Sequence, residues 1–187
     1  DAVLVGDTDL LIPPFTEVVL EGRGRSRAEL LERLAVLPSV YVPSLWEIER
    51  DAGERISGFG PRVPGIDRPA AVTGDRWNES IVLSDGAYFA DMHLVETSRG
   101  CGRGCLFCAT RCAFGELRHR PADDVLAAAR AAGEHTRRIG LISTALGDHP
   151  DDRLILRELG RQGFELNIPS LRAETVELAR VQLEGTQ

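Results

Sequence analysis

The sequence predicts an α/β fold built around a parallel sheet, and two features of the second half of the chain support this. Short apolar segments at residues 93–96, 139–144 and 164–168 have the length and composition of buried strands. A segment with helical features follows each of them. Regular alternation of strands and helices is typical of a parallel sheet with right-handed crossovers. The pattern does not by itself separate an open sheet from a barrel.

The helices of this half are predicted from their end signals. Pro121 suits a first helical turn, and Asp123 and Asp124 lie where the helix dipole favours negative charge. Gly133 is suited to close the same helix. The three expected helices cover residues 121–133, 151–159 and 173–183.

The first 90 residues predict a less regular arrangement. Residues 2–6 indicate a short buried strand, and a helix is expected around residues 15–20. Ser26 and Glu29 form a capping-box pattern, which predicts a second helix that ends near Pro38. The remaining expected segments are an extended stretch at 40–42, a Gly- and Pro-rich connector over 53–90, and strand pieces within it at 81–83 and 88–89.

Composition excludes some classes of function. The 187 residues carry a net charge of -7, which argues against nucleic acid held mainly by phosphate contacts. No run of about 18 apolar residues is present, so no membrane span is predicted. The chain starts at Asp1 and stops at Gln187 in the middle of the alternating pattern. We therefore expect it to be a fragment of a longer protein.

The four cysteines of the chain all lie within residues 101–112. A disulfide framework would spread its cysteines along the chain, so this clustering indicates a metal or redox site in a reducing cytoplasm. Cys101, Cys105 and Cys108 have the spacing C-x3-C-x2-C directly after a predicted strand. Three thiolates on one loop can bind a [4Fe-4S] cluster and leave its fourth iron open. Glycines at 100, 102 and 104 are expected to let this loop fold tightly.

Other interpretations of the same cysteines stay open. Cys112 can complete a closed four-cysteine cluster of an electron-transfer protein, or it can be a packed thiol with no ligand role. Structural zinc is a third interpretation, although structural zinc sites usually pair two ligand segments across a fold.

The loop resembles that of the radical S-adenosylmethionine (SAM) superfamily, with Phe107 as the aromatic residue of C-x3-C-x-Φ-C. The resemblance implies that Cys101, Cys105 and Cys108 bind a [4Fe-4S] cluster, whose open iron is chelated by SAM. It also implies reductive cleavage of SAM to a 5′-deoxyadenosyl radical, with electrons from a donor such as flavodoxin or ferredoxin. The implied fold is a (β/α)6 TIM-like barrel, and residues 91–187 would supply its first three β/α units.

The resemblance also assigns roles to residues after the cluster loop. Phe107 would pack near the SAM adenine, and Gly147 and Asp148 would approach the SAM amino group. Arg172 would meet a SAM carboxylate or a substrate anion. The alternatives are a helix-capping Asp148 and a surface Arg172. The sequence identifies no catalytic residue and no substrate.

We assign no cofactor or metal-binding role to two arginines and four histidines of this part of the chain. Arg118 and Arg120 are expected to be solvated, and no histidine shows metal-ligand spacing. The histidines are His93, His119, His135 and His149.

Residues 1–52 resemble the C-terminal part of a Rossmann-like cobalamin-binding domain, which makes cobalamin a further candidate cofactor. Asp91 and His93 nearly match the lower-ligand pattern D-x-H-x-x-G, but Glu96 replaces its glycine, so we assign no ligand here. A methylthiotransferase-type radical SAM enzyme is the runner-up within the superfamily. Such an enzyme would need three further cluster cysteines, and residues 1–90 contain none.

Overall fold

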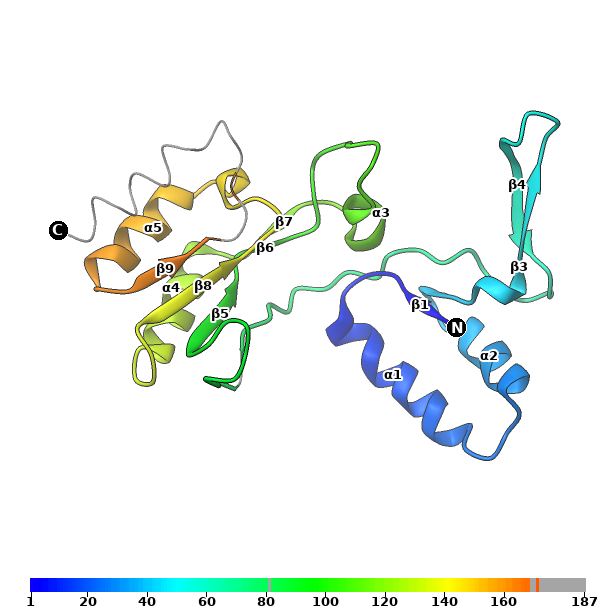
Figure 1. Cartoon of the computed structure of the whole chain (residues 1–187), viewed down its shortest axis with the longest axis horizontal. Helices are drawn as coiled ribbons and strands as arrows, with labels where there is room; N and C mark the ends of the chain where they lie inside the picture. The colour runs from blue at the N-terminus through cyan, green and yellow to red at the C-terminus, as the bar shows by residue number, and fades with distance from the viewer. Residues whose placement is uncertain (81, 169–170, 172–187) are drawn as a thin grey trace. The chain divides into compact units, whose positions relative to one another are not determined.

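The computed structural model describes residues 1–80, 82–168 and 171. The chain divides into two compact units, which are described separately. The first unit comprises residues 1–75 and 103–115, and the second comprises residues 76–102 and those from 116 onward. Figure 1 labels the elements of both.

The second unit contains the predicted parallel sheet, whose strand order is β5-β8-β9 (Figure 1). Both neighbouring pairs are parallel, and each connection between successive strands contains a helix. The prediction of alternating strands and helices is therefore confirmed from β5 to β9. The bounds are β5 Met92–Glu96, α4 Ala122–Ala132, β8 Arg138–Ile142, α5 Asp152–Arg161 and β9 Glu165–Asn167.

Both helices of this unit contribute to one apolar core with the sheet. Alternate strand residues point to the helices, because side chains along a strand alternate between its two faces. These inward residues include Val95, Ile139 and Leu141, all of which are fully buried. The helix residues packed with them are Val125 and Ala129 from α4 and Ile155, Leu156 and Leu159 from α5.

The other face of the sheet contains a glycine for a steric reason. A Cβ added to Gly140 would lie 2.6 Å from Leu94 Cδ2 and 2.8 Å from Met92 Sδ. Gly140 on β8 therefore leaves the space that these two β5 side chains occupy.

The free edge of β5 is covered by residues 78–80, which we call the edge segment. Ser80 donates its N–H to the carbonyl of Leu94 (2.9 Å), and Glu96 donates to the carbonyl of Asn78 (3.0 Å). Glu79 lies opposite Val95 in an antiparallel bridge. The expected strand pieces are wrong where the structure describes them. Residues 82–83 are in no strand, residues 88–89 lie in a turn, and residue 81 lies outside the described residues.

The cysteine-containing segment begins and ends in a short antiparallel ladder. Strand β6, Ser98–Arg99, pairs with strand β7, Arg118–His119. The ladder brings the two ends of the intervening segment together at its base. This segment includes the short helix α3, Thr110–Phe114.

The first unit pairs strand β1, Val3–Leu4, with strand β2, Val40–Tyr41, in antiparallel fashion. Helix α2, Arg27–Ala35, begins with the predicted capping box, in which Ser26 and Glu29 bond reciprocally. The short 3-10 helix η1, Pro43–Leu45, follows β2. The predicted strand, second helix and extended stretch are thus present, although the elements are shorter than expected. The prediction that the strand at residues 2–6 is buried is wrong, since Val3 is exposed.

Helix α1 is longer than predicted. It covers Thr8–Glu21 and continues through Pro13 and Pro14, whereas the expected helix began only at residue 15. Proline inside a helix removes a backbone hydrogen bond and usually ends the helix. Here the first turns bury Leu11, which is only 5% exposed, so packing outweighs the local penalty.

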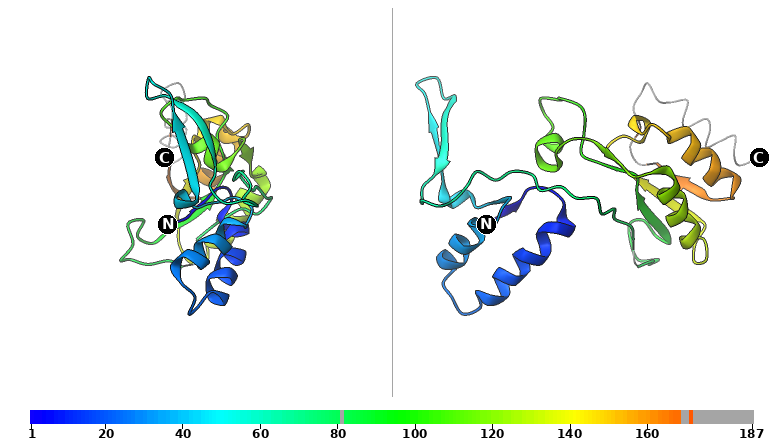
Figure 2. Two further views of the ribbon diagram at one scale, coloured as in Figure 1. Left: turned by 90° about the vertical axis from the view of Figure 1, so that its right-hand side faces the viewer. Right: turned by 180° about the vertical axis from the view of Figure 1, so that it is seen from behind.

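A β-hairpin follows in the first unit (Figure 2). Strand β3, Trp46–Arg50, pairs antiparallel with strand β4, Ile56–Pro61, and the ring of Trp46 stacks on Phe59 at 4.5 Å between centroids. The turn of this hairpin contains residues 52 and 53, so the predicted start of the connector at residue 53 lies inside a hairpin.

The described strands form small sheets, and no closed barrel is found among them. The expected helix at 173–183 lies outside the described residues. Within the described part of the chain, no helix combines the length and apolar character needed to cross a bilayer.

Candidate functional site

The four cysteines lie in the segment between β6 and β7, which we call the cysteine loop, and none of them is in a disulfide bond; Cys112 belongs to α3. Cys101 is half-buried, whereas Cys105, Cys108 and Cys112 are exposed. The backbone N–H of Cys108 donates to the carbonyl of Cys105 (3.1 Å), which forms a turn between these two residues. Hydrogen bonds from Thr110, whose Oγ1 lies 3.2 Å from Cys108 Sγ, lower the pKa of the Cys108 thiol. A lower pKa favours the thiolate, which is the form that binds metal.

Only one of the three loop glycines adopts a conformation that requires glycine. Gly100 has a φ of 78°, in the left-handed region that other residues rarely enter. Gly102 and Gly104 do not have positive φ. A Cβ at Gly102 would meet nothing closer than 3.9 Å, and a Cβ at Gly104 would meet nothing within 4 Å. The expectation that all three glycines avoid Cβ clashes is therefore wrong for the last two.

The segment after β8 is tied to the start of the cysteine loop. Thr144 Oγ1 donates to the carbonyl of Gly100 (2.9 Å), the residue before Cys101. The N–H of Thr97 donates to the carbonyl of Ile142 (2.9 Å), which joins the carboxyl ends of β5 and β8. Ligand sites of α/β folds commonly form at this edge of the sheet. Residues 144–148 and the first cysteine therefore share the edge at which such a site is expected.

The structure describes three of the four other predicted cofactor-binding residues. Gly147 and Asp148 are half-buried in the short 3-10 helix η2, Leu146–Asp148. Helix α5 begins at Asp152 with Asp151 at its N-cap, so the interpretation of Asp148 as its cap is wrong. Phe107 is 93% exposed. Arg172 lies outside the described residues.

The fit of a cluster to this loop rests on the chemistry of its donors. Within the described residues, no group of three or more His, Cys, Asp or Glu side chains is arranged so that it could hold a metal ion. Metal binding itself supplies free energy that brings ligands together. Three thiols outside any disulfide lie within eight residues, one of them with a lowered pKa, and thiols are the soft donors that iron–sulfur clusters use. The donor set therefore fits such a cluster.

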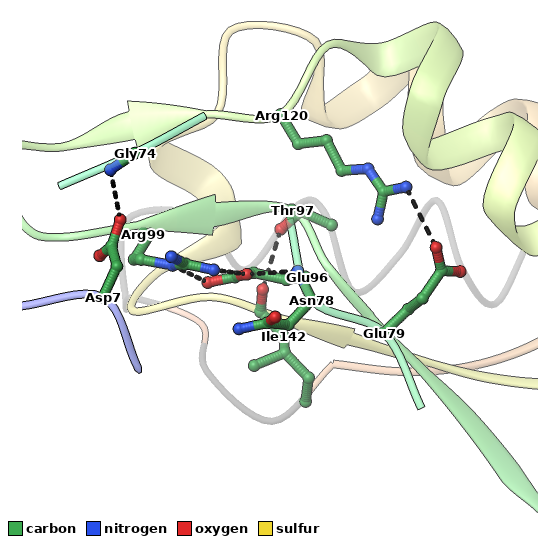
Figure 3. A network of polar contacts seen from close by, with 9 residues as sticks. All are labelled: Asp7, Gly74, Asn78, Glu79, Glu96, Thr97, Arg99, Arg120 and Ile142. Carbon is green, nitrogen blue, oxygen red and sulfur yellow. Dashed lines mark hydrogen bonds and ion pairs between the residues drawn. The ribbon is translucent and has the colours of Figure 1, made fainter. Parts of the chain in front are cut away.

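A buried ion pair lies directly before the cysteines (Figure 3). Arg99 Nε donates to Glu96 Oε1 (2.6 Å), and Arg99 Nη2 donates to Glu96 Oε2. The two side chains are only 7% and 13% exposed. The N–H of Asn78 donates to Glu96 Oε2 (2.9 Å), and the guanidinium of Arg99 lies 5.9 Å from the centre of the Trp77 ring.

A second buried arginine lies at the other end of the cysteine loop. Arg120 is 8% exposed, so the prediction that it is solvated is wrong. Its N–H donates to the carbonyl of Thr97 (2.9 Å), and its Nη2 lies 3.6 Å from Glu79 Oε1 (Figure 3). Glu79 Oε2 is also 3.2 Å from His93 Nε2. The edge segment thus contacts residues that flank both ends of the cysteine loop: Asn78 contacts Glu96 before the loop, and Glu79 contacts Arg120 after it.

His149 has a structural role at this edge of the sheet. It is 3% exposed, and its Nδ1 accepts the N–H of Asp151 (3.0 Å). Nδ1 therefore carries no proton, and Nε2 donates to the carbonyl of Arg120 (2.9 Å).

The ring of His119 lies 4.9 Å from that of His149. Burial lowers the pKa of His119, and His149 adds to this effect, while Asp148 and Asp151 oppose it.

The lowered pKa of His119 predicts that the stability of the protein falls in mild acid. The unfolded chain takes up a proton on His119 near pH 6.5, whereas the native state takes it up only at lower pH. The contribution of His119 to stability is therefore present above pH 6.5 and is lost as the pH falls. We expect the advantage in melting temperature of the wild type over His119→Gln to shrink between pH 7.5 and 5.5. The exposed His135→Gln variant is the control, and an advantage that stays constant with pH would contradict the prediction.

No protein-family model matches the chain. A similar protein of Methanocaldococcus jannaschii, described as uncharacterized, is 31% identical over 94 residues, which is 49% of this chain. The aligned part covers 21% of that protein, so the chain spans about a fifth of the length of this relative.

Proposed function

We propose that this chain is part of a radical SAM enzyme that binds a [4Fe-4S] cluster through Cys101, Cys105 and Cys108. The observation that carries the proposal is the C-x3-C-x2-C loop at the carboxyl end of the first strand of a parallel β/α sheet. Supporting observations are that these cysteines form no disulfide and that a hydrogen bond joins residue 144 to residue 100. The sheet would then be the first part of a (β/α)6 barrel.

In this proposal the cluster, when bound, supplies a low-potential electron and an open iron for SAM. The protein supplies binding and orientation. Gly147 and Asp148 would bind the SAM amino group, Phe107 would contact the adenine, and Arg172 would meet a carboxylate. Phe107 is exposed and can accept such a contact.

The wider context of the enzyme follows from the same proposal. Electrons would come from a donor such as flavodoxin or ferredoxin in a reducing cytoplasm, which keeps thiols free. Residues 1–52 would be the end of a cobalamin-binding domain, with cobalamin as a second cofactor. The substrate is left open, since its contacts would come from later parts of the barrel.

An iron–sulfur electron carrier is the second candidate, and one observation favours it. Cys112 is a free, exposed thiol in α3, four residues after Cys108. A fourth thiolate would close the cluster and leave no iron for SAM.

The experiment that separates these functions uses the 187-residue chain after anaerobic reconstitution with iron and sulfide. The reduced protein is examined by EPR with and without SAM. A [4Fe-4S] signal that SAM changes is the expected result. A signal that SAM leaves unchanged would indicate the electron carrier, and a colourless protein that binds zinc would overturn both candidates.

A further inference from the structure

Cys105 and Cys108 lie at the two ends of one tight turn. The backbone N–H of Cys108 donates to the carbonyl of Cys105 (3.1 Å), and residues 106 and 107 form the turn between them. The Cα atoms of the first and fourth residues of such a turn lie less than about 7 Å apart. Disulfides join cysteines whose Cα atoms are usually about 4.4–6.8 Å apart. The backbone of this turn therefore already holds the two cysteines close enough for a disulfide bond.

The turn is also open to small molecules in solution. Cys105 and Cys108 are both exposed, and neither is in a disulfide bond. The side chains of Leu106 and Phe107 between them are almost fully exposed as well. Residues 103–115 belong to the first unit, so the whole turn lies within a single unit. A small oxidant can therefore reach this pair without any movement of one unit against the other.

Cys112 is a poorer partner for Cys108 than Cys105 is. It lies four residues further along the chain, in helix α3, whose N-cap is Ala109. Even along a continuous helix, residues four apart have Cβ atoms about 5–6 Å apart, whereas a disulfide needs about 3.5–4.5 Å. The pairing that the backbone of this segment favours is therefore Cys105 with Cys108.

We infer that Cys105 and Cys108 form a reversible disulfide with each other, which makes residues 105–108 a thiol–disulfide redox site. The oxidant is a small-molecule disulfide of the glutathione class. The inference goes beyond the proposed function, because this chemistry needs no metal. The disulfide and the proposed [4Fe-4S] cluster exclude each other, since each needs the same two sulfur atoms, and only this exclusion rests on the proposed function.

The reaction consists of two thiol–disulfide exchanges. The thiolate of one cysteine attacks a sulfur atom of oxidised glutathione, so that a mixed disulfide forms, the S–S bond of glutathione breaks and one glutathione thiolate leaves. The second cysteine attacks the cysteine sulfur of the mixed disulfide and displaces the other glutathione. The two cysteines lose two electrons and two protons, which end in two molecules of reduced glutathione. Because the turn holds the second cysteine nearby, the second exchange is intramolecular, and the mixed disulfide does not accumulate.

The test uses the metal-free full chain in anaerobic glutathione buffers with increasing ratios of oxidised to reduced glutathione. Samples are quenched with acid, their thiols are blocked with N-ethylmaleimide, and trypsin digests the product for mass spectrometry. Trypsin cleaves after arginine, so Cys105 and Cys108 share the peptide 104–111, whereas Cys101 and Cys112 fall in two other peptides. The expected disulfide therefore stays within one peptide, and every pairing with Cys101 or Cys112 links two peptides.

We expect the disulfide within peptide 104–111 to exceed all linked peptides by about tenfold or more, since the turn raises the effective concentration of one thiol at the other. An excess of reduced glutathione should restore both thiols. The inference is overturned if linked peptides are the main product, if a mixed disulfide with glutathione accumulates on this peptide, or if both thiols stay reduced in excess oxidised glutathione.

Cys108→Ser and Cys112→Ser are matched variants, because each removes an exposed thiol from the same segment. In Cys108→Ser the reaction should stop at a mixed disulfide between Cys105 and glutathione. Cys112→Ser should form the internal disulfide as the wild type does. Loss of that disulfide in Cys112→Ser would contradict the assigned pairing.

A second measurement separates this inference from the proposed function. The reduced chain is reconstituted with iron and sulfide and examined by EPR. A reversible disulfide in a chain that binds no cluster overturns only the proposed function, and a cluster in a chain that forms no such disulfide overturns only this inference. Where both form, a bound cluster should slow disulfide formation about tenfold or more, because it occupies both sulfur atoms. Equal rates with and without the cluster would contradict the mutual exclusion.

Discussion

Replacing Cys105 by alanine is expected to abolish the [4Fe-4S] signal of the reconstituted chain, whereas replacing Cys112 is expected to retain it. Cys105 is the central ligand of the C-x3-C-x2-C spacing, and its loss leaves only two of the three proposed thiolate ligands, too few to retain a four-iron cluster with one open position. We expect at least a tenfold loss of bound iron and sulfide per chain, measured chemically and by EPR.

The Cys112→Ala variant is a matched control, because both cysteines are exposed and lie on the same loop. Neither substitution removes a buried side chain, so both variants should have the wild-type melting temperature before reconstitution. Loss of the cluster in Cys112→Ala would show four-cysteine ligation and would favour the electron carrier. Retention in Cys105→Ala would contradict the proposed ligand set.

Leu156→Ala is expected to destabilise the second unit strongly. Leu156 is 1% exposed in α5 and belongs to the core between the helices and the sheet. Truncation of a buried leucine removes its transfer free energy and leaves a cavity, which together cost about 3–5 kcal/mol. The free energy of unfolding should fall by this amount in urea titrations followed by circular dichroism.

Leu154→Ala is the matched control, since it makes the same change two residues earlier in the same helix. Leu154 is 46% exposed, so its loss should change the free energy of unfolding by no more than about 0.5 kcal/mol. Equal losses in both variants would show that helix propensity, and not core packing, controls the stability of α5.

Local signals account for the elements that were predicted correctly. The apolar segments of β5, β8 and β9 and the end signals of α4 depend on neighbouring residues, so the sequence pattern alone predicts these elements. The capping box at Ser26 is confirmed for the same reason. Helix α1 was predicted too short, because the burial of Leu11 outweighs the effect of Pro13 and Pro14.

Some residues of the candidate site could also be predicted from local sequence, and others could not. The three proposed ligands lie within eight consecutive residues, so the ligand set can be predicted from the sequence without knowledge of the fold. Glu96 and Arg99 were not identified, because a glutamate and an arginine three residues apart are common on any protein surface. The burial of Arg120 was missed for a similar reason, since its contact with Glu79 joins residues 41 positions apart.

The sequence was sufficient to predict the order of β5, α4, β8, α5 and β9 and the residue types of the proposed cluster site. These depend on local spacing and on side-chain chemistry. Only the tertiary structure decided that residues 78–80 cover the edge of β5, that Thr144 contacts the loop at Gly100, and that Arg99 and Arg120 are buried. The physical reason is that backbone pairing and burial depend on which distant segments meet, and a backbone N–H or carbonyl carries no sequence signal for its partner.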